Sequence, residues 1–380
     1  MKIRNLPHQF QLYIGFFLYA LVLGAIFPRL GELQRAMQIG ESDLGLGLLG
    51  FALGTQVSLM LAGGLIKKIG FKLVILLGIP LLGAAEIAAS FMPSLAGFFI
   101  CLVIAGLAIG MLEVVFNLEA DRTEFRLGRL VMNRAHAFWS FGMFAAGLIG
   151  ATAAQFDVSP SQHLIILNII CFILMALVFS NFKPAPARNE NKTPPPKFVR
   201  PSIGILTLVA FTLSAMLLEG AGADWSVIYM RDIFDMPAFI NGMALTLGAL
   251  TQAVTRYFAD PYIEKYGPVK IARILISLLG IGAIIVTFAP NAYLALAGFA
   301  LIGVGTSSIF PLAMSAAAQR PDRDAATNVA SLAQLSFFIF LLAPPILGYI
   351  AEHWGIRVSF GVSLPLILVS WFTLSSLKNN

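Results

Sequence analysis

The chain has 380 residues, of which 58% are hydrophobic and 12% are charged. A soluble domain carries roughly 25% charged residues, so this composition excludes an ordinary soluble protein and favours one whose surroundings are largely lipid. The net charge of +6 is small and spread along the chain, which excludes a polycationic tail and gives no sign of a nucleic-acid partner.

Apolar runs long enough to cross a bilayer recur along the whole chain. A hydrocarbon core about 30 Å thick needs about 20 apolar residues in a helix, and these runs are continuous, unlike the alternating strands of a membrane barrel. The first run lacks a small-residue cleavage site, so we expect it to remain as a membrane span. Twelve spans are predicted: 9–31, 42–66, 72–92, 95–120, 132–156, 161–181, 201–231, 238–262, 268–289, 292–317, 325–350 and 356–376.

Lysine and arginine are unevenly distributed between the predicted loops. With the N-terminus in the cytoplasm, twenty of the 25 Lys and Arg residues fall on the cytoplasmic side, four fall on the opposite side, and Arg256 lies within a span. An excess of these residues marks the cytoplasmic side of a membrane protein. We therefore predict a multi-pass protein of the bacterial inner membrane whose N- and C-termini are both cytoplasmic.

One long polar segment interrupts the apolar runs near the middle of the chain. Residues 183–200 are rich in proline and charge, which predicts a semi-extended linker. Six predicted spans lie on each side of it. The expected domains are an N-terminal six-helix bundle over 1–182, a cytoplasmic linker over 183–200 and a C-terminal six-helix bundle over 201–380.

The two halves resemble each other after their second span. The segment GGLIKKIGFK begins at Gly63, and DPYIEKYGPVK begins at Asp260. Placing Gly70 on Gly267 gives an offset of 197, which also superposes the first two spans on the seventh and eighth. Such a repeat is typical of secondary transporters built from two related halves.

This repeated loop resembles the signature G-x-L-x-D-R-x-G-R-K of the major facilitator superfamily of secondary transporters. Its first copy matches at Gly63, Leu65, Lys68, Gly70 and Lys72, with Lys67 in place of the acidic residue, and its second copy is approximated by Glu264, Lys265, Gly267 and Lys270. The resemblance covers essentially the whole chain and implies an all-α membrane fold of twelve helices in two pseudo-symmetric six-helix bundles.

Four further segments are similar to the bacterial YbjJ and MosC-like subgroup of that family. They are EVVFNLEADR from Glu113, HAFWSFG from His136, LEGAGADW from Leu218 and APPILGYIAEHWG from Ala343. The chain also departs from wider family patterns. Val103 stands where many members carry an arginine in the fourth span, and the glycine-proline signature of antiporters in the fifth span is incomplete. The second departure makes an exchange of drugs for protons less favoured.

Polar residues inside the fourth and seventh spans are the main candidates for function, because charges in hydrocarbon are costly. Glu113 and Asn117 continue a stripe of small residues on one helix face, and the resemblance implies that this span lines a central cavity. Glu219 is expected across that cavity, with Asp224 and Trp225 nearer the outer end of the seventh span. The alternatives are a helix-packing seam for Glu113, a solvated or capping Asp224, and an interface aromatic at Trp225.

Other polar residues have less direct interpretations. His136 can relay protons with Glu113 or Glu119, or simply pack at a helix start. Neutral hydrogen-bonding groups for a polar solute or for helix contacts are supplied by Thr306, Ser307, Ser308, Asn328 and Gln334. Glu86, among small residues of the third span, is expected to be hydrogen-bonded across a tight helix interface.

The repeated loops carry the predicted gate. Arg256 and Asp260 are four positions apart, which allows an ion pair on one helix surface. We expect them to act in a cytoplasmic gate or hinge rather than on the solute. The full set of predicted gate residues is Gly63, Lys67, Gly70, Arg256, Asp260, Glu264 and Gly267.

No enzyme signature, nucleotide cradle or metal-ligand spacing occurs in the sequence. We therefore predict a monomeric secondary transporter without cofactor, driven by the proton gradient, that carries a small polar solute, sugar-like or an amine, by symport and alternating access. One alternative is a proton-coupled exporter of amphipathic compounds, for which the 31 Phe residues are the argument. An alternative from another class is a membrane sensor or scaffold that transports nothing.

Overall fold

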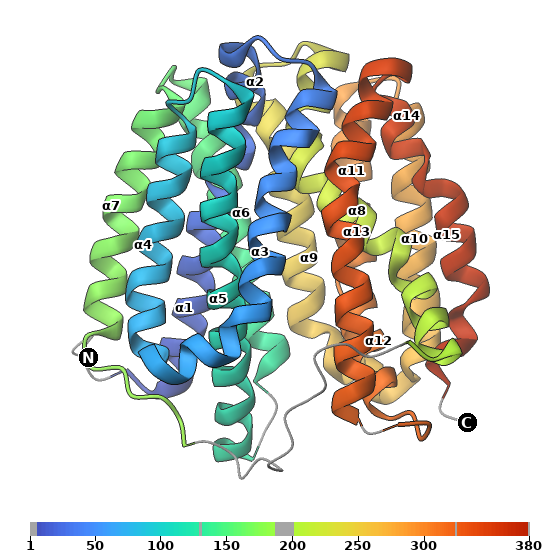
Figure 1. Ribbon diagram of the computed structural model, residues 1–380. Coiled ribbons are helices and arrows are strands. Elements are labelled where there is room, and N and C mark those ends of the chain that lie inside the picture. Colours follow the sequence, from blue (N-terminus) through green and yellow to red (C-terminus); the bar gives the residue numbers. More distant parts are fainter. Residues whose placement is uncertain (1–5, 129–130, 187–200, 324, 379–380) are drawn as a thin grey trace.

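The structure is a computed structural model that describes residues 6–128, 131–186, 201–323 and 325–378. Of Gly63, Ala325, Ala326 and Phe337 it describes the backbone only. In these ranges every regular element is a helix, and the helices stand side by side in two groups (Figure 1). The predicted fold class, an all-α membrane protein of two helical bundles, is confirmed.

Seven α-helices form the first bundle. The first predicted span is divided, because Pro28 lies in the first turn of a 3-10 helix and lacks a backbone donor. The elements are α1 His8–Gly24, η2 Phe27–Arg29, α2 Leu30–Met37, α3 Glu41–Ile69, α4 Phe71–Ala89, α5 Leu95–Leu127, α6 Met132–Gln155 and α7 Pro160–Phe179.

The second bundle has two divided spans. The tenth predicted span breaks between α11 and α12 at Ser307 and Ser308, and the twelfth breaks between α14 and α15 at Val362. The elements are α8 Ile203–Phe234, α9 Ala238–Tyr266, α10 Pro268–Phe288, α11 Ala292–Thr306, α12 Ile309–Ala318, α13 Ala325–Trp354, α14 Ile356–Gly361, α15 Ser363–Phe372 and η3 Leu374–Leu377.

Eleven helical segments of the described chain are long and apolar enough to cross a membrane. The divided first and tenth spans each count once among them. The twelfth predicted span is present as a shorter apolar helix, Ile356–Phe372, which packs against α8 and α10 of its own bundle. Each of the twelve predicted spans therefore corresponds to a helix or a helix pair.

The internal repeat is visible in the helix bounds. The offset of 197 carries the bounds of α3, 41–69, onto those of α9, 238–266, and also carries the starts of α4 and α5 onto those of α10 and α11. The turns after α3 and α9 match as well, since Gly70 has φ 85° and ψ 153° and Gly267 has φ 81° and ψ 153°. Glycine is required at both turns because a positive φ strains residues with a Cβ.

Close helix packing inside each bundle depends on small residues. A Cβ placed on Gly106 of α5 would lie 2.9 Å from the Cα of Gly54 on α3, so the two backbones touch. The equivalent position of the second bundle, Gly303 of α11, packs on the backbone of Gly248 in α9. Contacts of this type hold membrane helices together where the hydrophobic effect cannot.

The start of α1 and the end of η3 lie on the same face of the molecule, here called the terminal face, and the opposite face is called the distal face (Figure 1). The two bundles meet mainly along α6 and α9 and along α3 and α13. Near the distal face, Arg231 of α8 donates to the carbonyl of Gly31 at 2.9 Å, and the backbone of Ser42 donates to Glu352 at 2.8 Å. The distal ends of the bundles are thus joined by direct hydrogen bonds.

The predicted linker lies largely outside the described residues, which resume at 201 after 186. The domain boundaries at 182 and 201 therefore stay predictions.

Candidate functional site

A chain of polar side chains runs through the first bundle at the level of Glu113, the nineteenth of 33 residues in α5. The Asn117 amide donates to the Glu113 carboxylate at 2.9 Å and to its carbonyl at 2.8 Å. His136 of α6 lies 3.0 Å from the Asn117 amide oxygen, which requires a proton on its Nε2. Tyr19 of α1 donates to Glu113 at 3.5 Å. Three helices therefore contribute to one network.

A second group of polar side chains surrounds Arg256, which is 8% exposed. Its Nη2 lies 3.9 Å from the Glu219 carboxylate, and its Nε donates to the carbonyl of Ser307 at 2.8 Å. That carbonyl is available because α11 ends at Thr306. Glu219 is the seventeenth of 32 residues in α8, so it lies near the middle of its helix, as Glu113 does.

Serine 140 of α6 connects the two bundles. Its hydroxyl accepts a hydrogen bond from Arg256 at 3.2 Å and lies 3.2 Å from the amide oxygen of Gln252 on α9. Gln252 in turn donates to the hydroxyl of Thr306 at 3.3 Å. His136 precedes Ser140 by one helical turn, so α6 carries a member of each group on adjacent turns.

We call these residues the central polar network: Tyr19, Glu113, Asn117, His136, Ser140, Glu219, Gln252, Arg256, Thr306 and Ser307. Its ionisable groups besides the tyrosine are two carboxyls, one guanidinium and one imidazole. From the residues that the sequence singles out, the structure thus brings together Glu113, Asn117, His136, Glu219, Arg256, Thr306 and Ser307.

Three of these members were missed by sequence reasoning. Tyr19, Ser140 and Gln252 each stand within an apolar span, where a polar group needs a partner. A polar side chain standing alone in an apolar span is therefore the sequence feature by which these three residues could have been predicted. Arg256 was predicted as part of the gate, but it contacts Glu219 and Ser307 in the interior instead.

The predicted ion pair of Arg256 with Asp260 does not form among the described contacts. Asp260 accepts a hydrogen bond from Asn133 at the start of α6, across the bundle interface. Arg256 is directed inward, because the carbonyl released at the α11 break and the Glu219 carboxylate both lie on that side. Asp260 thus joins the two bundles closer to the terminal face.

Glutamate 119 is separate from the predicted relay with His136. It lies two positions after Asn117, about 200° around the helix, and binds other groups. His8 of α1 is 2.6 Å from its carboxylate, and the backbone of Ala185 donates to the same oxygen at 2.7 Å. His136 has Asn117 as its side-chain partner instead.

Asn328 and Trp225 also lie away from the network's hydrogen bonds. Asn328 donates to Asp322 in the loop before α13 at 2.9 Å, so it faces the terminal end of the second bundle. Trp225 is 0% exposed and packs at Gly348 of α13, which excludes the alternative of an aromatic at the lipid interface. Ser308 is buried beside Ser307, and Asp224 is half-buried on α8.

The remaining predicted gate residues lie at the terminal turns. Lys67 and Glu264 are exposed at the ends of α3 and α9, one turn before Gly70 and Gly267. The surroundings of Gly63 lie outside the described residues. Within the described part of the chain, these positions make no hydrogen bond or ion pair to the central polar network.

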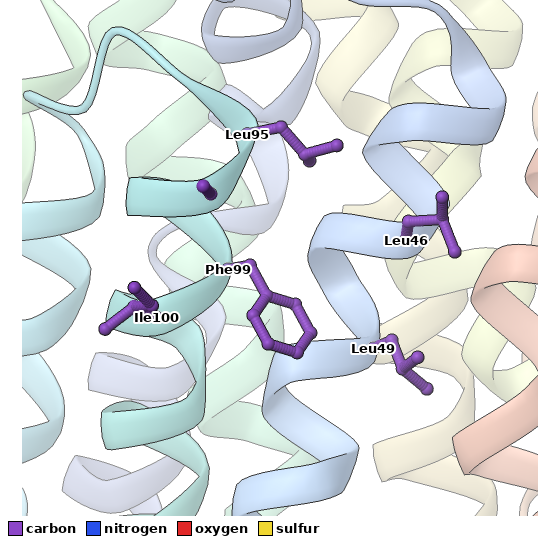
Figure 2. A pocket seen from close by; sticks show the side chains of 6 residues that line it. Leu46, Leu49, Leu95, Phe99 and Ile100 are labelled. Carbon is purple, nitrogen blue, oxygen red and sulfur yellow. The ribbon is translucent and has the colours of Figure 1, made fainter.

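One cavity of about 490 Å³ lies between α3 and α5, away from these polar groups (Figure 2). Its lining consists of Leu46, Leu49, Leu95, Ala96, Phe99 and Ile100. An entirely apolar lining suits lipid chains and offers nothing to orient a polar solute. We therefore place the candidate site at the central polar network.

Comparison with known proteins assigns the family. The model of the Major Facilitator Superfamily matches residues 12–339 and, in a second match, residues 207–378. With its helical fold and its internal repeat, the chain belongs to the Major Facilitator Superfamily, and it is a membrane transporter rather than an enzyme.

Relatives of the chain include several bacterial transporters. It is 26% identical over 348 residues to the uncharacterized transporter y4wD of Sinorhizobium fredii, covering 91% of this chain and 92% of that one. It is 24% identical over 345 residues to the membrane protein MosC of Rhizobium meliloti, covering 90% and 83%. A shorter match, 28% over 269 residues, covers 68% of this chain and 67% of the quinolone resistance protein NorA of Staphylococcus aureus.

Solved structures share the fold at low sequence identity. A variant of the nucleoside transporter NupG superposes with a TM-score of 0.74 at 12% identity, covering 98% of this chain and 100% of that one. A variant of the Escherichia coli fucose:proton symporter FucP superposes with a TM-score of 0.65 at 18% identity, covering 98% of each chain.

Proposed function

We propose that this chain carries a small polar solute, sugar-like or an amine, together with protons by alternating access. The observation that carries this proposal is the central polar network, in which Glu113 of the first bundle and Glu219 of the second lie near the middle of their helices and are linked through α6. Ionisable groups at that depth are retained for a function, because they are costly in hydrocarbon.

The charges of the network favour a neutral or singly cationic solute. The network holds two carboxyls and one guanidinium, whose charge is already shared between Glu219, Ser140 and the Ser307 carbonyl. A polyanion would find no free cation there among the described residues. Asn117, Ser140 and Gln252 can donate and accept hydrogen bonds, as recognition of hydroxyl or amine groups requires. The proposed binding site also includes Asp224, Trp225, Ser308 and Asn328. We propose that these four residues contact the solute in another state of the transport cycle.

Protons couple to solute movement through the carboxyls. A proton on Glu219 neutralises the partner of Arg256, whose guanidinium then depends on Ser140 and the Ser307 carbonyl alone. Because Ser140 belongs to the other bundle, the charge on Glu219 changes how firmly the bundles are joined. The charge on Glu113 acts on Asn117 and, through it, on His136 within the first bundle, with Glu119 fixing the start of α1 through His8 instead of relaying the proton.

The proposal places the terminal face in the cytoplasm of a bacterial cell, with the inner membrane as the location. This orientation is supported by the twenty Lys and Arg residues expected on that side. The distal contacts of Arg231 and Glu352 then close the external side, and the gate residues Lys67, Gly70, Asp260, Glu264 and Gly267 lie at the cytoplasmic turns. The unit is a monomer of two bundles joined by the 183–200 linker.

The test begins with the solute. A thermal-shift screen of the purified chain against sugars, amines and nucleosides, run at two pH values, identifies ligands that stabilise the native state. Uptake of the best ligand into proteoliposomes is then measured with and without an inwardly directed proton gradient. We expect the gradient to stimulate uptake by the wild type and not by Glu113→Gln or Glu219→Gln.

Asp43→Asn is the matched control, because Asp43 is an exposed carboxylate in the first turn of α3, away from the network. It should respond to the gradient as the wild type does. If both glutamine variants retained a full response, the coupling mechanism would be wrong. Ligand stabilisation without any flux would favour a sensor or scaffold instead.

A second candidate is a proton-coupled exporter of amphipathic compounds. It is favoured by the similarity to NorA over two thirds of the chain and by the aromatic rings beside the network, where Phe16 and Tyr19 pack on Phe116, and Phe16 also packs on His136. Competition in the thermal-shift assay separates the two candidates. Displacement of a polar ligand by lipophilic cations, and stronger stabilisation by them, would support export.

A further inference from the structure

Two kinds of charged side chain lie outside the central polar network. Glu86 of α4 is buried, and neither of its carboxyl oxygens has a hydrogen-bond partner within the described part of the chain. The predicted hydrogen bond across the helix interface is therefore not observed. Lys265 and Lys270, at the turn between α9 and α10, are exposed instead. These lysines are accessible to a partner outside the chain, whereas the buried carboxyl is not.

The outer face of α9 presents a graded series of exposed side chains. Val254, Phe258 and Tyr262 recur at every fourth residue and are 42–58% exposed. Lys265 continues this face, and its side chain points about 180° around the helix from that of Arg256, nine positions earlier. Because Arg256 is directed toward the central polar network, the series is directed away from it, toward the lipid.

The order of the series follows the order of environments across one leaflet of a bilayer. The distance from Val254 to Lys265 along the helix axis is about 16 Å, and half of the hydrocarbon core is about 15 Å thick. Along this distance an aliphatic residue is followed by phenylalanine, tyrosine and lysine, as the surroundings change from hydrocarbon to the polar interface. A lipid molecule that lies along this face has its headgroup at the turn between α9 and α10.

Two ammonium groups meet at one tyrosine ring in that turn. The Nζ of Lys265 lies 5.1 Å from the centroid of the Tyr266 ring, and the Nζ of Lys270 lies 5.0 Å from it. The ring attracts each cation, while the two cations repel each other. Glu264 is exposed beside them, yet neither lysine has an ion pair within the described part of the chain. The positive charge of the pair is thus left for an anion from outside.

The first repeat has the same exposed face without the same headgroup contacts. The offset of 197 carries Tyr266 and Lys270 onto Ile69 and Leu73, so the ring and the lysine beyond it are absent at these positions. The equivalents of the series on α9 are Val57, Leu61, Leu65 and Lys68, all of them exposed. The arrangement of two lysines around one ring is therefore specific to the second repeat, beyond the general excess of positive charge on the terminal face.

We propose that Lys265, Tyr266 and Lys270 bind the headgroup of an anionic phospholipid, whose acyl chain lies along Phe258 and Val254. The two ammonium groups donate hydrogen bonds to the lipid phosphate, and the ring between them keeps both directed toward it. The occupant is a lipid rather than a free anion, because the apolar face continues directly from the lysines. This inference concerns the surrounding membrane and is independent of the solute and of proton coupling.

Thermal unfolding of the full chain in a non-ionic detergent tests the site, because a ligand of the native state raises the melting temperature. The probe is dioleoylphosphatidylglycerol, and dioleoylphosphatidylcholine is the zwitterionic comparison. We expect only the anionic lipid to stabilise the wild type, and added salt to weaken its effect. The double variant Lys265→Gln, Lys270→Gln should need about 30-fold more lipid for half of the effect, since each lysine near an anionic surface contributes roughly fivefold.

Lys68→Gln is the matched control, because Lys68 occupies the position of Lys265 in the first repeat. It should respond to the lipid as the wild type does. Equal responses of the wild type and the double variant would overturn the site, and so would an equal loss in Lys68→Gln. Stabilisation by glycerol 3-phosphate at the concentrations of the lipid would show a site for free anions and would overturn the assignment to a lipid.

Native mass spectrometry supplies a readout that does not depend on melting. At the same lipid concentration, we expect the wild type to retain one more molecule of dioleoylphosphatidylglycerol than the double variant. Phe258→Ser should also reduce retention of the lipid, because it removes apolar contact with the acyl chain while both lysines remain. The same number of bound lipids on the wild type and the double variant would contradict the proposal.

Discussion

The guanidinium of Arg256 donates to the hydroxyl of Ser140 at 3.2 Å, so a buried cation of the second bundle is held by the first. The same cation is 3.9 Å from Glu219, which is 26% exposed. The bond to Ser140 therefore connects the charge state of a solvent-accessible carboxyl to the interface along which the two bundles meet. Few other contacts of the described chain combine burial, charge and a link between bundles.

Ser140→Ala should weaken this link. The variant removes one acceptor of Arg256 and the partner of Gln252, and we expect a loss of about 1–2 kcal/mol, as for buried hydrogen bonds to a charged group. Thermal unfolding in nanodiscs measures the loss, and Ser140→Thr should restore most of it by keeping the hydroxyl. The control is Ser277→Ala, since the Ser277 hydroxyl donates to the carbonyl of Arg273 in its own helix. Equal melting temperatures for both alanine variants would contradict the expectation.

The distal contacts should set the balance between open and closed external sides. Arg231 makes two hydrogen bonds to the other bundle, at 2.9 Å to the Gly31 carbonyl and 3.0 Å to Gln34. Arg231→Ala removes both, each worth about 1 kcal/mol, and should shift the equilibrium toward the distally open state by about 30-fold. Spin labels at the exposed positions Ala36 and His353, in a cysteine-free background, report this as a longer distance distribution.

Arg35→Ala is the control for that measurement, because Arg35 is an exposed arginine on α2, the short helix that carries the label at Ala36. Its distance distribution should match that of the parent. An unchanged distribution in Arg231→Ala would show that the α3–α13 contacts hold the distal face without the help of Arg231.

Much of the architecture was predictable because it depends on composition and periodicity. Apolar runs of about 20 residues can only be membrane helices, and the glycines at 70 and 267 fixed the repeat offset that the helix bounds reproduce. The breaks inside the first, tenth and twelfth spans were not predicted. Pro28 explains the first. Pro311 and Pro365 explain the other two, because a proline has no N–H to bond the carbonyl four residues before it, here that of Ser307 and that of Gly361.

The site was harder to predict, because a polar residue belongs to the central polar network only if its helix is rotated toward it and other helices supply a partner. Glu113 and Asn117 share a face by spacing alone, so their contact was within reach. Glu119 and Asn328 are also polar and buried, yet they face other elements, where His8 and Asp322 bind them. Arg256 was assigned to the gate because it lies close to the repeated loop in the sequence. The structure directs it inward instead, where it binds the carbonyl of Ser307 at the break between α11 and α12.

The turns at Gly70 and Gly267 should be equally sensitive to substitution. Each has a positive φ, and nothing lies within 4 Å of a Cβ placed there, so alanine would suffer only backbone strain. We expect Gly70→Ala and Gly267→Ala each to lose about 1–3 kcal/mol, because their φ and ψ lie in a region that essentially only glycine adopts. Gly64→Ala is the control, because Gly64 also has open space around its Cβ position but lies inside α3. It should be neutral or stabilising by up to about 1 kcal/mol.

Stability at the terminal face should depend on the charge of Asp322. Hydrogen bonds from the side chains of Ser202 and Asn328, and the nearby Arg320, hold the pKa of the Asp322 carboxyl below its usual range. A carboxyl whose pKa is lower in the folded state stabilises that state above the pKa of the unfolded chain. The contribution is lost as the pH falls through the folded-state pKa. Asp322→Asn should therefore lower the melting temperature at neutral pH, and the difference from the wild type should vanish in acid.

Melting curves of both proteins across a pH series measure this difference, which should be small because the Asp322 side chain is exposed to solvent. Asp232→Asn is unsuitable as a control, since Asp232 pairs with Arg231 of the distal contacts. Asp43→Asn serves instead, because Asp43 is exposed at the other face. Added salt should reduce the effect of Arg320 and leave the hydrogen bonds of Ser202 and Asn328 intact. A difference between wild type and Asp322→Asn that persists unchanged into acid would contradict a role for the ionised carboxylate.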